Sequence, residues 1–409
     1  MQASKSKAVF QKCSAPLDKY MSGFHSMLLT QGYSYATLHG KFKMIFNFNK
    51  WLITQDIKPY KINENVIKIF FKERPRSGYI RRGDLAVLNA LLKYLRDSGI
   101  APKKVDKIVN NDIQKIMRNF AEYLKNERGL APATLNSYLP IILRFLNERF
   151  GNNPVSLNEI TLRNVTHFVV RCSRLWTPKR SQLMTSALRS FFRYLRFHGD
   201  ITLDLAEAIP SVASWRLSEL PKSLDQGDIY RLLQSCDQNT AVEQRDYTVL
   251  LILSRLGLRP CEIVNMTLDD IDWESGVMTI HGKGGRHNQM PIPHDVGEAL
   301  SKYICKNRPP CATRRLFVRV RAPQQGFSGS AAVDDIMRRA LKRSGVKSLR
   351  KGAYLLRHSL ACSMLRRGNS LMEIGEILRH SNINTTEIYA KVNINALAAI
   401  AQPWAGGDL

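Results

Sequence analysis

Two helical patterns recur about 100 residues apart in the first half of the chain, and this repetition is the strongest constraint on its fold. The stretch 32–52, beginning G-Y-S-Y-A-T-L, aligns with 129–150, beginning G-L-A-P-A-T-L. Further along, L-L-K-Y-L-R-D-S-G-I (91–100) aligns with F-F-R-Y-L-R-F-H-G-D (191–200). Apolar residues recur every three or four positions in these segments, which predicts helices. We therefore expect two related helical domains, with a chance resemblance between short helices as the alternative.

The length of 409 residues exceeds what one ordinary hydrophobic core organises. Segment 208–224 loses the helical period and contains two prolines, which is typical of a linker. We expect an N-terminal helical DNA-binding domain over 1–105, a second helical domain over 106–215 and a C-terminal domain over 216–409.

The C-terminal part combines helices with a short sheet. Helical patterns at 229–236 and 246–256 lead into two alternating segments, 276–281 and 288–293, which a glycine-rich turn separates. Alternation of apolar and polar residues on both sides of such a turn predicts a β-hairpin. The expected fold class is mainly α with a small β-hairpin or sheet.

The charge balance points to a polyanionic partner. Lys and Arg number 61 against 34 Asp and Glu, a net charge of +27. The basic residues recur inside folded-looking segments such as R-P-R-S-G-Y-I-R-R (74–82) rather than in one tail. A solubility surplus and a membrane-surface protein are the alternatives, but this distribution favours a long nucleic-acid-binding surface.

The cysteines and the hydropathy pattern indicate a reducing compartment. The seven cysteines are scattered without a C-x-x-C pair, which predicts neither a disulfide framework nor a zinc ribbon. No run approaches the ~18 apolar residues of a membrane span, and the N-terminus lacks an apolar signal region. We expect a soluble, cytoplasmic protein without a membrane partner.

Two basic residues in the C-terminal part stand at positions suited to binding an anion. Gly257 can close one helix and Pro260 can open the next, so Arg259 lies beside a helix N-terminus, where the helix dipole disfavours a cation. A bound anion would resolve that conflict. Lys283 falls at the tip of the expected hairpin, although an ordinary solvated turn lysine would produce the same pattern.

Further candidates cluster near the C-terminus. Arg357 borders the apolar face of a helical segment, and S-L-M-E (370–373) is a capping box that opens a helix ending before His380. N-T-T-E (384–387) is a second such box, with Tyr389 in the first turns of the following helix. Taken singly, a tyrosine in a helix is usually packing and a histidine at a helix end is usually a cap.

An arginine, a lysine, a second arginine, a histidine and a tyrosine follow one another along the C-terminal part. Residues of these types in this order resemble the tyrosine recombinase (phage integrase) family. G-L-R-P-C-E-I matches the first arginine box of that family, G-K-G-G-R the hairpin lysine, L-L-R-H-S the second arginine box and L-R-H-S-N-I-N-T-T-E-I-Y the last box. The resemblance is close over 224–395, and 115–210 resembles the helical, SAM-like core-binding domain more loosely. It assigns no metal and implies an active site of Arg259, Lys283, Arg357, His380 and Tyr389, with Tyr354 and His358 in supporting positions.

Two residues depart from the family pattern. Tyr354 stands where the second arginine box usually has histidine, and a phenol titrates near ~10 rather than near neutrality. The role of that position therefore stays open. Arg379 replaces the usual glycine of the last box, which adds positive charge and is expected to do little harm.

The resemblance implies a site-specific recombinase or integrase that cuts and rejoins DNA through a 3′-phosphotyrosyl intermediate. One ester replaces another, so the reaction needs no nucleotide cofactor. The arginines would clamp the phosphate, Tyr389 would attack it, and Lys283 would protonate the leaving 5′ oxygen. The acidic run at 269–272 is expected to form a turn before the hairpin, with a cation site as the alternative.

The resemblance also implies partners: double-stranded DNA held in a clamp, a homo-tetramer on paired sites, and accessory proteins in some systems. Such an enzyme would be associated with the nucleoid. The small, apolar segment 393–402 would dock on a neighbouring protomer or on its own domain. The rival functions are a catalytically weakened, recombinase-like DNA-binding protein and a type IB topoisomerase-like enzyme. The sequence does not indicate the target site, or choose among integration, excision and transposition.

Overall fold

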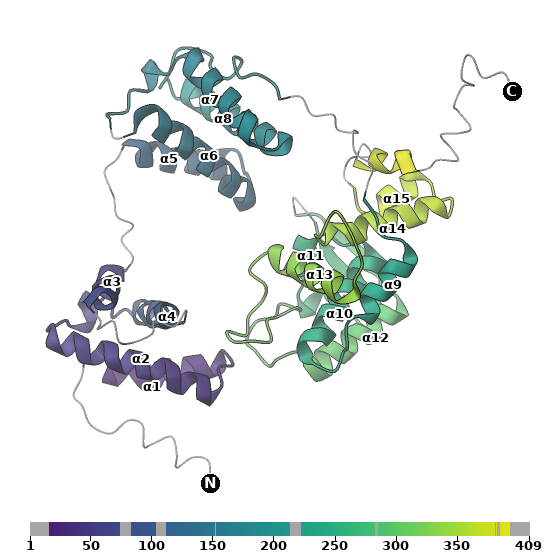
Figure 1. The fold of residues 1–409 in the computed structure, drawn as a ribbon, viewed down its shortest axis with the longest axis horizontal. Helices are drawn as coiled ribbons and strands as arrows, with labels where there is room; N and C mark the ends of the chain where they lie inside the picture. The colour runs from purple at the N-terminus through teal and green to yellow at the C-terminus, as the bar shows by residue number, and fades with distance from the viewer. Residues whose placement is uncertain are drawn as a thin grey trace, which may run out of the picture. The chain divides into compact units, whose positions relative to one another are not determined.

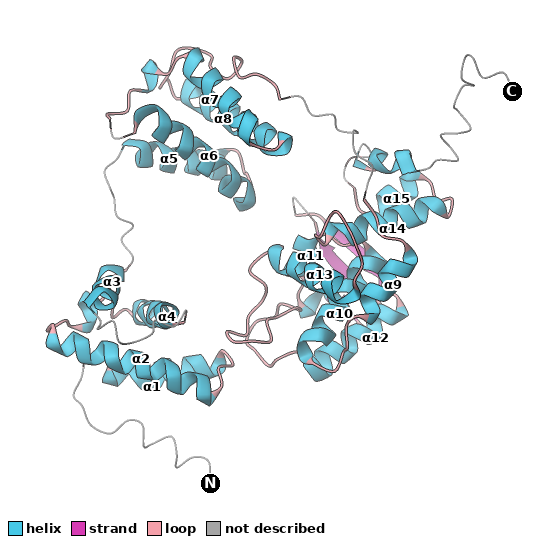
Figure 2. Cartoon of the chain, in the orientation of Figure 1, coloured by secondary structure: helices cyan, strands magenta, loops and turns pink. Residues whose placement is uncertain are grey.

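The computed structural model consists mainly of helices, with one small antiparallel sheet (Figures 1 and 2). The predicted fold class is confirmed. No helix in the described ranges is both long enough and apolar enough to cross a membrane. The structure describes residues 16–73, 83–103, 112–151, 153–212, 222–282, 285–380, 382 and 385–392.

The first group of helices follows the apolar periodicity of the sequence. Each helix turns one apolar stripe toward a shared cluster of buried side chains, which includes Phe24, Phe48, Phe70 and Leu91. The described elements of this group are α1 (Asp18–Thr30), α2 (Tyr35–Thr54), the 3₁₀ turn η2 (Pro59–Lys61), α3 (Glu64–Glu73) and α4 (Asp84–Asp97).

The second group has the same order of elements and its own cluster, which includes Phe120, Phe145, Phe168 and Phe191. The π-helical turn η3 directly continues the first helix of the group. The described elements are α5 (Asp112–Glu122), η3 (Tyr123–Glu127), α6 (Pro132–Phe150), the 3₁₀ turn η4 (Leu157–Glu159), α7 (Leu162–Leu175) and α8 (Pro178–Phe197).

Within each group, an equivalent aromatic contact joins the last helix to the first. The ring of Tyr94 in α4 lies 5.4 Å from that of Phe24 in α1, and the ring of Tyr194 in α8 lies 5.3 Å from that of Phe120 in α5. The aligned tyrosines thus pack the last helix on the first in the same way. That the two groups are related domains stays a prediction.

The division at 105 and 215 stays a prediction. The contacts group Lys104–Ser218 into one compact unit and Met1–Lys103 with Glu219–Leu409 into another. Most of the expected linker, residues 213–221, and the apolar segment 393–402 lie outside the described residues.

The C-terminal part is built around α10, which is buried along most of its length and contacts α9, α12, α13 and α14 (Figure 1). Its elements are α9 (Gln226–Gln234), α10 (Ala241–Leu256), α11 (Pro260–Asn265), η5 (Leu268–Asp270), β1 (Ile271–Asp272), β2 (Val277–His281), β3 (His287–Pro291), α12 (His294–Lys302), η6 (Tyr303–Asn307), α13 (Ala331–Ser344), α14 (Tyr354–Arg366), α15 (Leu371–Ile377) and η8 (Glu387–Val392).

The sheet, drawn in magenta in Figure 2, contains the expected hairpin and one further strand. Strands β2 and β3 pair antiparallel, with Thr279 opposite Gln289, and β1 adds to the other edge of β2. The acidic run supplies both the 3₁₀ turn η5 and strand β1, so it forms more than the predicted turn. Buried Asp270 accepts hydrogen bonds from Thr267 and lies 2.6 Å from Nε2 of His281.

Candidate active site

Arg259 is the residue before α11, in extended backbone, as the sequence predicts. Its side chain is held by Glu262, one turn into the helix. The backbone N–H of Arg259 donates to Oε2 of Glu262 at 2.8 Å, and Nη1 donates to Oε1 at 2.7 Å. The buried Glu262 carboxylate therefore offsets the cation at the helix N-terminus, and only 27% of the Arg259 side chain is exposed.

Gly257 allows two parts of the site to approach closely. It ends α10 with φ of 58°, in the left-handed region that favours glycine. A Cβ atom here would lie 2.8 Å from Leu378 and 2.9 Å from Leu360. The absence of a side chain thus brings the end of α10 against α14 and the residue after α15.

Arg357 lies deeper than its expected position at the border of the core, with 3% of its surface exposed. Its Nη1 donates to the carbonyl of Gly257, and its Nη2 donates to the carbonyl of Leu378. Burial lowers its pKa to about 10, and the charges of Arg259 and Arg379 add to that effect. The guanidinium is still protonated at neutral pH.

His380 follows α15, which Ser370 and Glu373 open with the predicted capping box. Its Nδ1 lies 2.8 Å from Oγ1 of the fully buried Thr386. Burial, followed by the neighbouring cations with Arg357 first among them, lowers the pKa of His380 to about 4. His380 is therefore neutral at physiological pH.

Tyr389 is almost fully buried, with 1% of its surface exposed. It lies in the 3₁₀ helix η8 rather than in the expected α-helix, and it packs on Cys362 and neighbouring apolar residues of α14 and α15. Its phenol oxygen is 2.9 Å from Nδ1 of His358. Burial raises the pKa of Tyr389 to about 12. The predicted capping box at 384–387 includes Asn384, which lies outside the described residues.

The two supporting residues differ in position. Tyr354 is the first residue of α14 and is 48% exposed. The pKa of its phenol is raised, because partial burial outweighs the opposing effect of the nearby charges of Arg259 and Arg357. His358, one turn later, faces Tyr389 instead. Lys283, which the sequence predicts at the hairpin tip, lies outside the described residues.

Two residues of this site were missed by the sequence reasoning. Glu262 holds Arg259, and its place three residues into a helix that begins after Arg259 was the available signal. Thr386 holds His380, and only the tertiary fold brings these two side chains together. No cluster of three or more His, Cys, Asp or Glu able to hold a metal is found in the described part of the chain.

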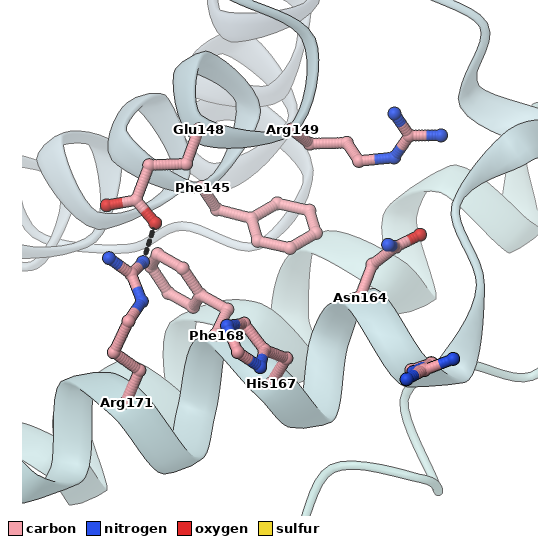
Figure 3. A pocket seen from close by; sticks show the side chains of 8 residues that line it. Phe145, Glu148, Arg149, Asn164, His167, Phe168 and Arg171 are labelled. Carbon is pink, nitrogen blue, oxygen red and sulfur yellow. Dashed lines mark hydrogen bonds and ion pairs between the residues drawn. The ribbon is translucent and has the colours of Figure 1, made fainter.

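A separate cavity of about 470 Å³ opens between α6 and α7 of the second helical group (Figure 3). Glu148 and Arg171 form an ion pair at its side, and the rings of Phe145 and Phe168 lie 5.2 Å apart at its base. Arg149, Arg163, Asn164 and His167 complete its lining.

In the first helical group, the large ring of Trp51 stands at the position that aligns with Glu148. There Phe48 and Phe70 lie 5.1 Å apart, and Trp51 packs on both rings. The Trp51 Nε1 donates to Glu73 at 3.1 Å, at the positions that Glu148 and Arg171 occupy in the second group. The two groups therefore present different surfaces.

Comparison with known proteins identifies the family of this chain. The phage integrase family matches residues 222–395, and its N-terminal SAM-like domain matches 117–199. The y4rA protein of Sinorhizobium fredii is 39% identical over 96% of this chain and 95% of its own length. Tyrosine recombinase XerC of Thermodesulfovibrio yellowstonii is 28% identical over 70% of this chain and 95% of its own length.

Among solved structures, the XerH site-specific recombinase bound to a palindromic difH substrate has a TM-score of 0.57 at 20% identity. That likeness covers 76% of this chain and 93% of the XerH chain. The fold, the matched family and the relatives that span the chain lead to one assignment. This chain belongs to the phage integrase family of tyrosine recombinases, enzymes that cleave and rejoin DNA strands.

Proposed function

We propose that the chain exchanges DNA strands at specific sites through a 3′-phosphotyrosyl intermediate on Tyr389. One observation carries this proposal: Nη2 of Arg357 donates to the carbonyl of Leu378, and Nη2 of Arg259 donates to the carbonyl of Arg379 at 3.1 Å. Both guanidiniums thus converge on the two residues directly before His380. The proposed catalytic residues are Arg259, Lys283, Arg357, His380 and Tyr389.

The arginines suit a phosphodiester because its charge grows during the reaction. The phosphate carries one negative charge and develops a second in the pentacoordinate transition state. The guanidinium groups of Arg259 and Arg357 can donate further N–H groups to the non-bridging oxygens. Neutral His380 adds a hydrogen bond without requiring a proton from solution.

The strand is cut when the phenol oxygen of Tyr389 forms a bond to phosphorus and the bond from phosphorus to the 5′ oxygen breaks. His358, 2.9 Å from the phenol, is placed to accept the phenol proton. Lys283 would donate a proton to the leaving 5′ oxygen, a role that rests on its sequence position. Attack by a 5′ hydroxyl on the phosphotyrosine reverses these bond changes, so joining needs no nucleotide cofactor.

The phenol has to move before it can react. With 1% of Tyr389 exposed, no phosphodiester can reach its oxygen in this arrangement. The proposed reaction therefore requires η8 to shift when DNA binds, so that the phenol can reach the phosphate.

The partners follow from the charge and the reaction. Double-stranded DNA fits the net charge of +27, and the two helical groups would hold it together with the catalytic part. A homo-tetramer on two paired sites would exchange strands in turn, with or without accessory proteins. Such an enzyme would act on the nucleoid in the cytoplasm. A non-cutting DNA-binding protein or a type IB topoisomerase is not favoured, since the matched relatives are recombinases.

Mapping the covalent bond tests the proposal. Repeated or inverted sequences flanking the gene would supply candidate sites, and incubation with such DNA should give a covalent complex. Mass spectrometry of its peptides should find the nucleotide on Tyr389. An adduct on Tyr354, or cleavage without any adduct, would overturn the assignment.

A further inference from the structure

The backbone conformation and the burial of Arg379 are both energetically unfavourable. Its φ is 54°, in the left-handed region where side chains other than glycine are disfavoured. Only 7% of its side chain is exposed, and burial lowers the pKa of its guanidinium. A glycine would remove both penalties, so the expectation that this arginine is merely harmless does not explain it.

The side chain of Arg379 is directed into the site. Its Nη2 donates to Oε2 of Glu262 at 3.2 Å, and its Nη1 donates to the carbonyl of Ile377 at 3.0 Å and contacts the sulfur of Met290. Its buried Nε has no hydrogen-bond partner in the described residues. The Glu262 carboxylate is the anion that holds this buried guanidinium.

Residue 379 is linked to Arg259 directly through its carbonyl and indirectly through Glu262. Its carbonyl accepts from Nη2 of Arg259 at 3.1 Å, and its side chain shares the Glu262 carboxylate with the same arginine. Oε1 of Glu262 binds Arg259, whereas Oε2 also binds Arg379. Without Arg379, the whole charge of this buried carboxylate would act on Arg259.

The charge count shows what that sharing changes. Arg259, Arg357 and Arg379 with Glu262 leave two positive charges in the described cluster, and His380 is neutral. A phosphodiester transition state carries about two negative charges. Replacing Arg379 by glycine would leave one positive charge, with Arg259 drawn more strongly to the carboxylate.

We propose that Arg379 is a positioning residue that neutralises Glu262, so that Arg259 and the net charge of the cluster remain available to the phosphodiester transition state. The inference rests on the proposed function of Arg259 and Arg357. It assigns Arg379 no contact with the substrate.

The test measures single-turnover formation of the covalent adduct on saturating DNA for Arg379→Gly, Arg379→Lys and the double variant Arg379→Gly/Glu262→Gln. We expect Arg379→Gly to cleave roughly tenfold more slowly or worse, with unchanged DNA affinity. The lysine variant should cleave faster than the glycine variant. Adding Glu262→Gln should restore part of the rate, since it removes the carboxylate that Arg379 offsets.

Unchanged cleavage by Arg379→Gly would overturn the inference. A further loss of cleavage rate in the double variant would also overturn it. That loss would show that Arg379 and Glu262 support the structure of the site rather than balance its charge. The pH profile gives an independent readout. Arg379 is one of the cations that lower the pKa of His380, so its removal should move the acid limb of the cleavage rate to higher pH. An unmoved limb would argue against an electrostatic role.

The wild-type protein separates this inference from the proposed function. If wild type forms no adduct on Tyr389, the proposed function fails and Arg379 has no role to support. If wild type forms the adduct and Arg379→Gly does so equally fast, only the inference about Arg379 fails. The lysine variant keeps the positive charge. If Arg379→Gly fails to fold, the cleavage rate of Arg379→Lys relative to wild type still tests the inference.

Discussion

The Nδ1 atom of His358 lies 2.9 Å from the phenol oxygen of Tyr389, and the two ring centroids are 5.7 Å apart. His358 directly follows Arg357 in α14, so the helix that contains the proposed phosphate-binding Arg357 also contacts the proposed nucleophile through His358. The hydrogen bond links the second arginine box to the last box through side chains. This contact is the basis for the proposed role of His358 as the base that accepts the phenol proton.

Replacing His358 should therefore slow cleavage. We expect His358→Ala to form adduct more slowly than His358→Gln, because glutamine can still hydrogen-bond the phenol and alanine cannot. DNA binding, measured by fluorescence anisotropy, should match wild type in both. Equal rates for wild type and His358→Ala would show that the contact has no catalytic role.

The two tyrosines of the site should behave differently. Tyr389→Phe should abolish covalent attachment with DNA affinity near that of wild type, because only the attacking oxygen is lost. Tyr354→Phe should only slow attachment, and Tyr354→His should be tolerated, since an imidazole titrates near working pH. Gel analysis of denatured complexes measures each rate; attachment by Tyr389→Phe would disprove the assignment.

The low pKa of His380 makes stability depend on pH in a defined direction. Its pKa falls from 6.5 to about 4 on folding, so the unfolded chain binds more protons between these values. The free energy of unfolding should therefore rise with pH across this window and fall on acidification. Urea titrations should show a weaker dependence for His380→Gln; an identical dependence would mean that His380 is not buried as a neutral side chain.

Metal removal should leave cleavage intact. In the proposed mechanism, Arg259 and Arg357 stabilise the phosphate charge that a divalent cation stabilises in many nucleases. Adduct formation in excess chelator should proceed at the untreated rate. Loss of activity that magnesium restores would require a different mechanism.

Much of the fold was predictable because its helices follow the 3.6-residue apolar period and its hairpin strands flank a glycine-rich turn. The position of Arg259 was predictable from a local signal, namely a helix start, whereas the apolar face beside Arg357 predicted the border of the core rather than its near-complete burial. The strand β1 was missed because two residues are too short to show a period.

The contacts between distant segments could not be read from the sequence. The hydrogen bond between His358 and Tyr389 and the one between His380 and Thr386 depend on how the segment from Thr386 through η8 packs on α14 and α15. The near-complete burial of Tyr389 likewise reflects tertiary packing rather than helix capping. Arg379 was expected to do little because its backbone angle and its contact with Glu262 leave no local signal.

The close approach at Gly257 predicts a large effect from a single methyl group. Gly257→Ala places a Cβ atom in a left-handed residue and 2.8 Å from Leu378, whereas a Cβ at Gly276, with φ of 65°, meets nothing within 4 Å. Gly276→Ala is thus the matched control and should cost only the backbone term, about 1–2 kcal/mol. We expect Gly257→Ala to cost about 2–4 kcal/mol, since overpacking adds to that term. It should also slow cleavage, because the Gly257 carbonyl that accepts from Arg357 must shift. Urea unfolding and adduct formation measure the two effects, and equal losses of stability in both variants would show that the contact with Leu378 relaxes freely.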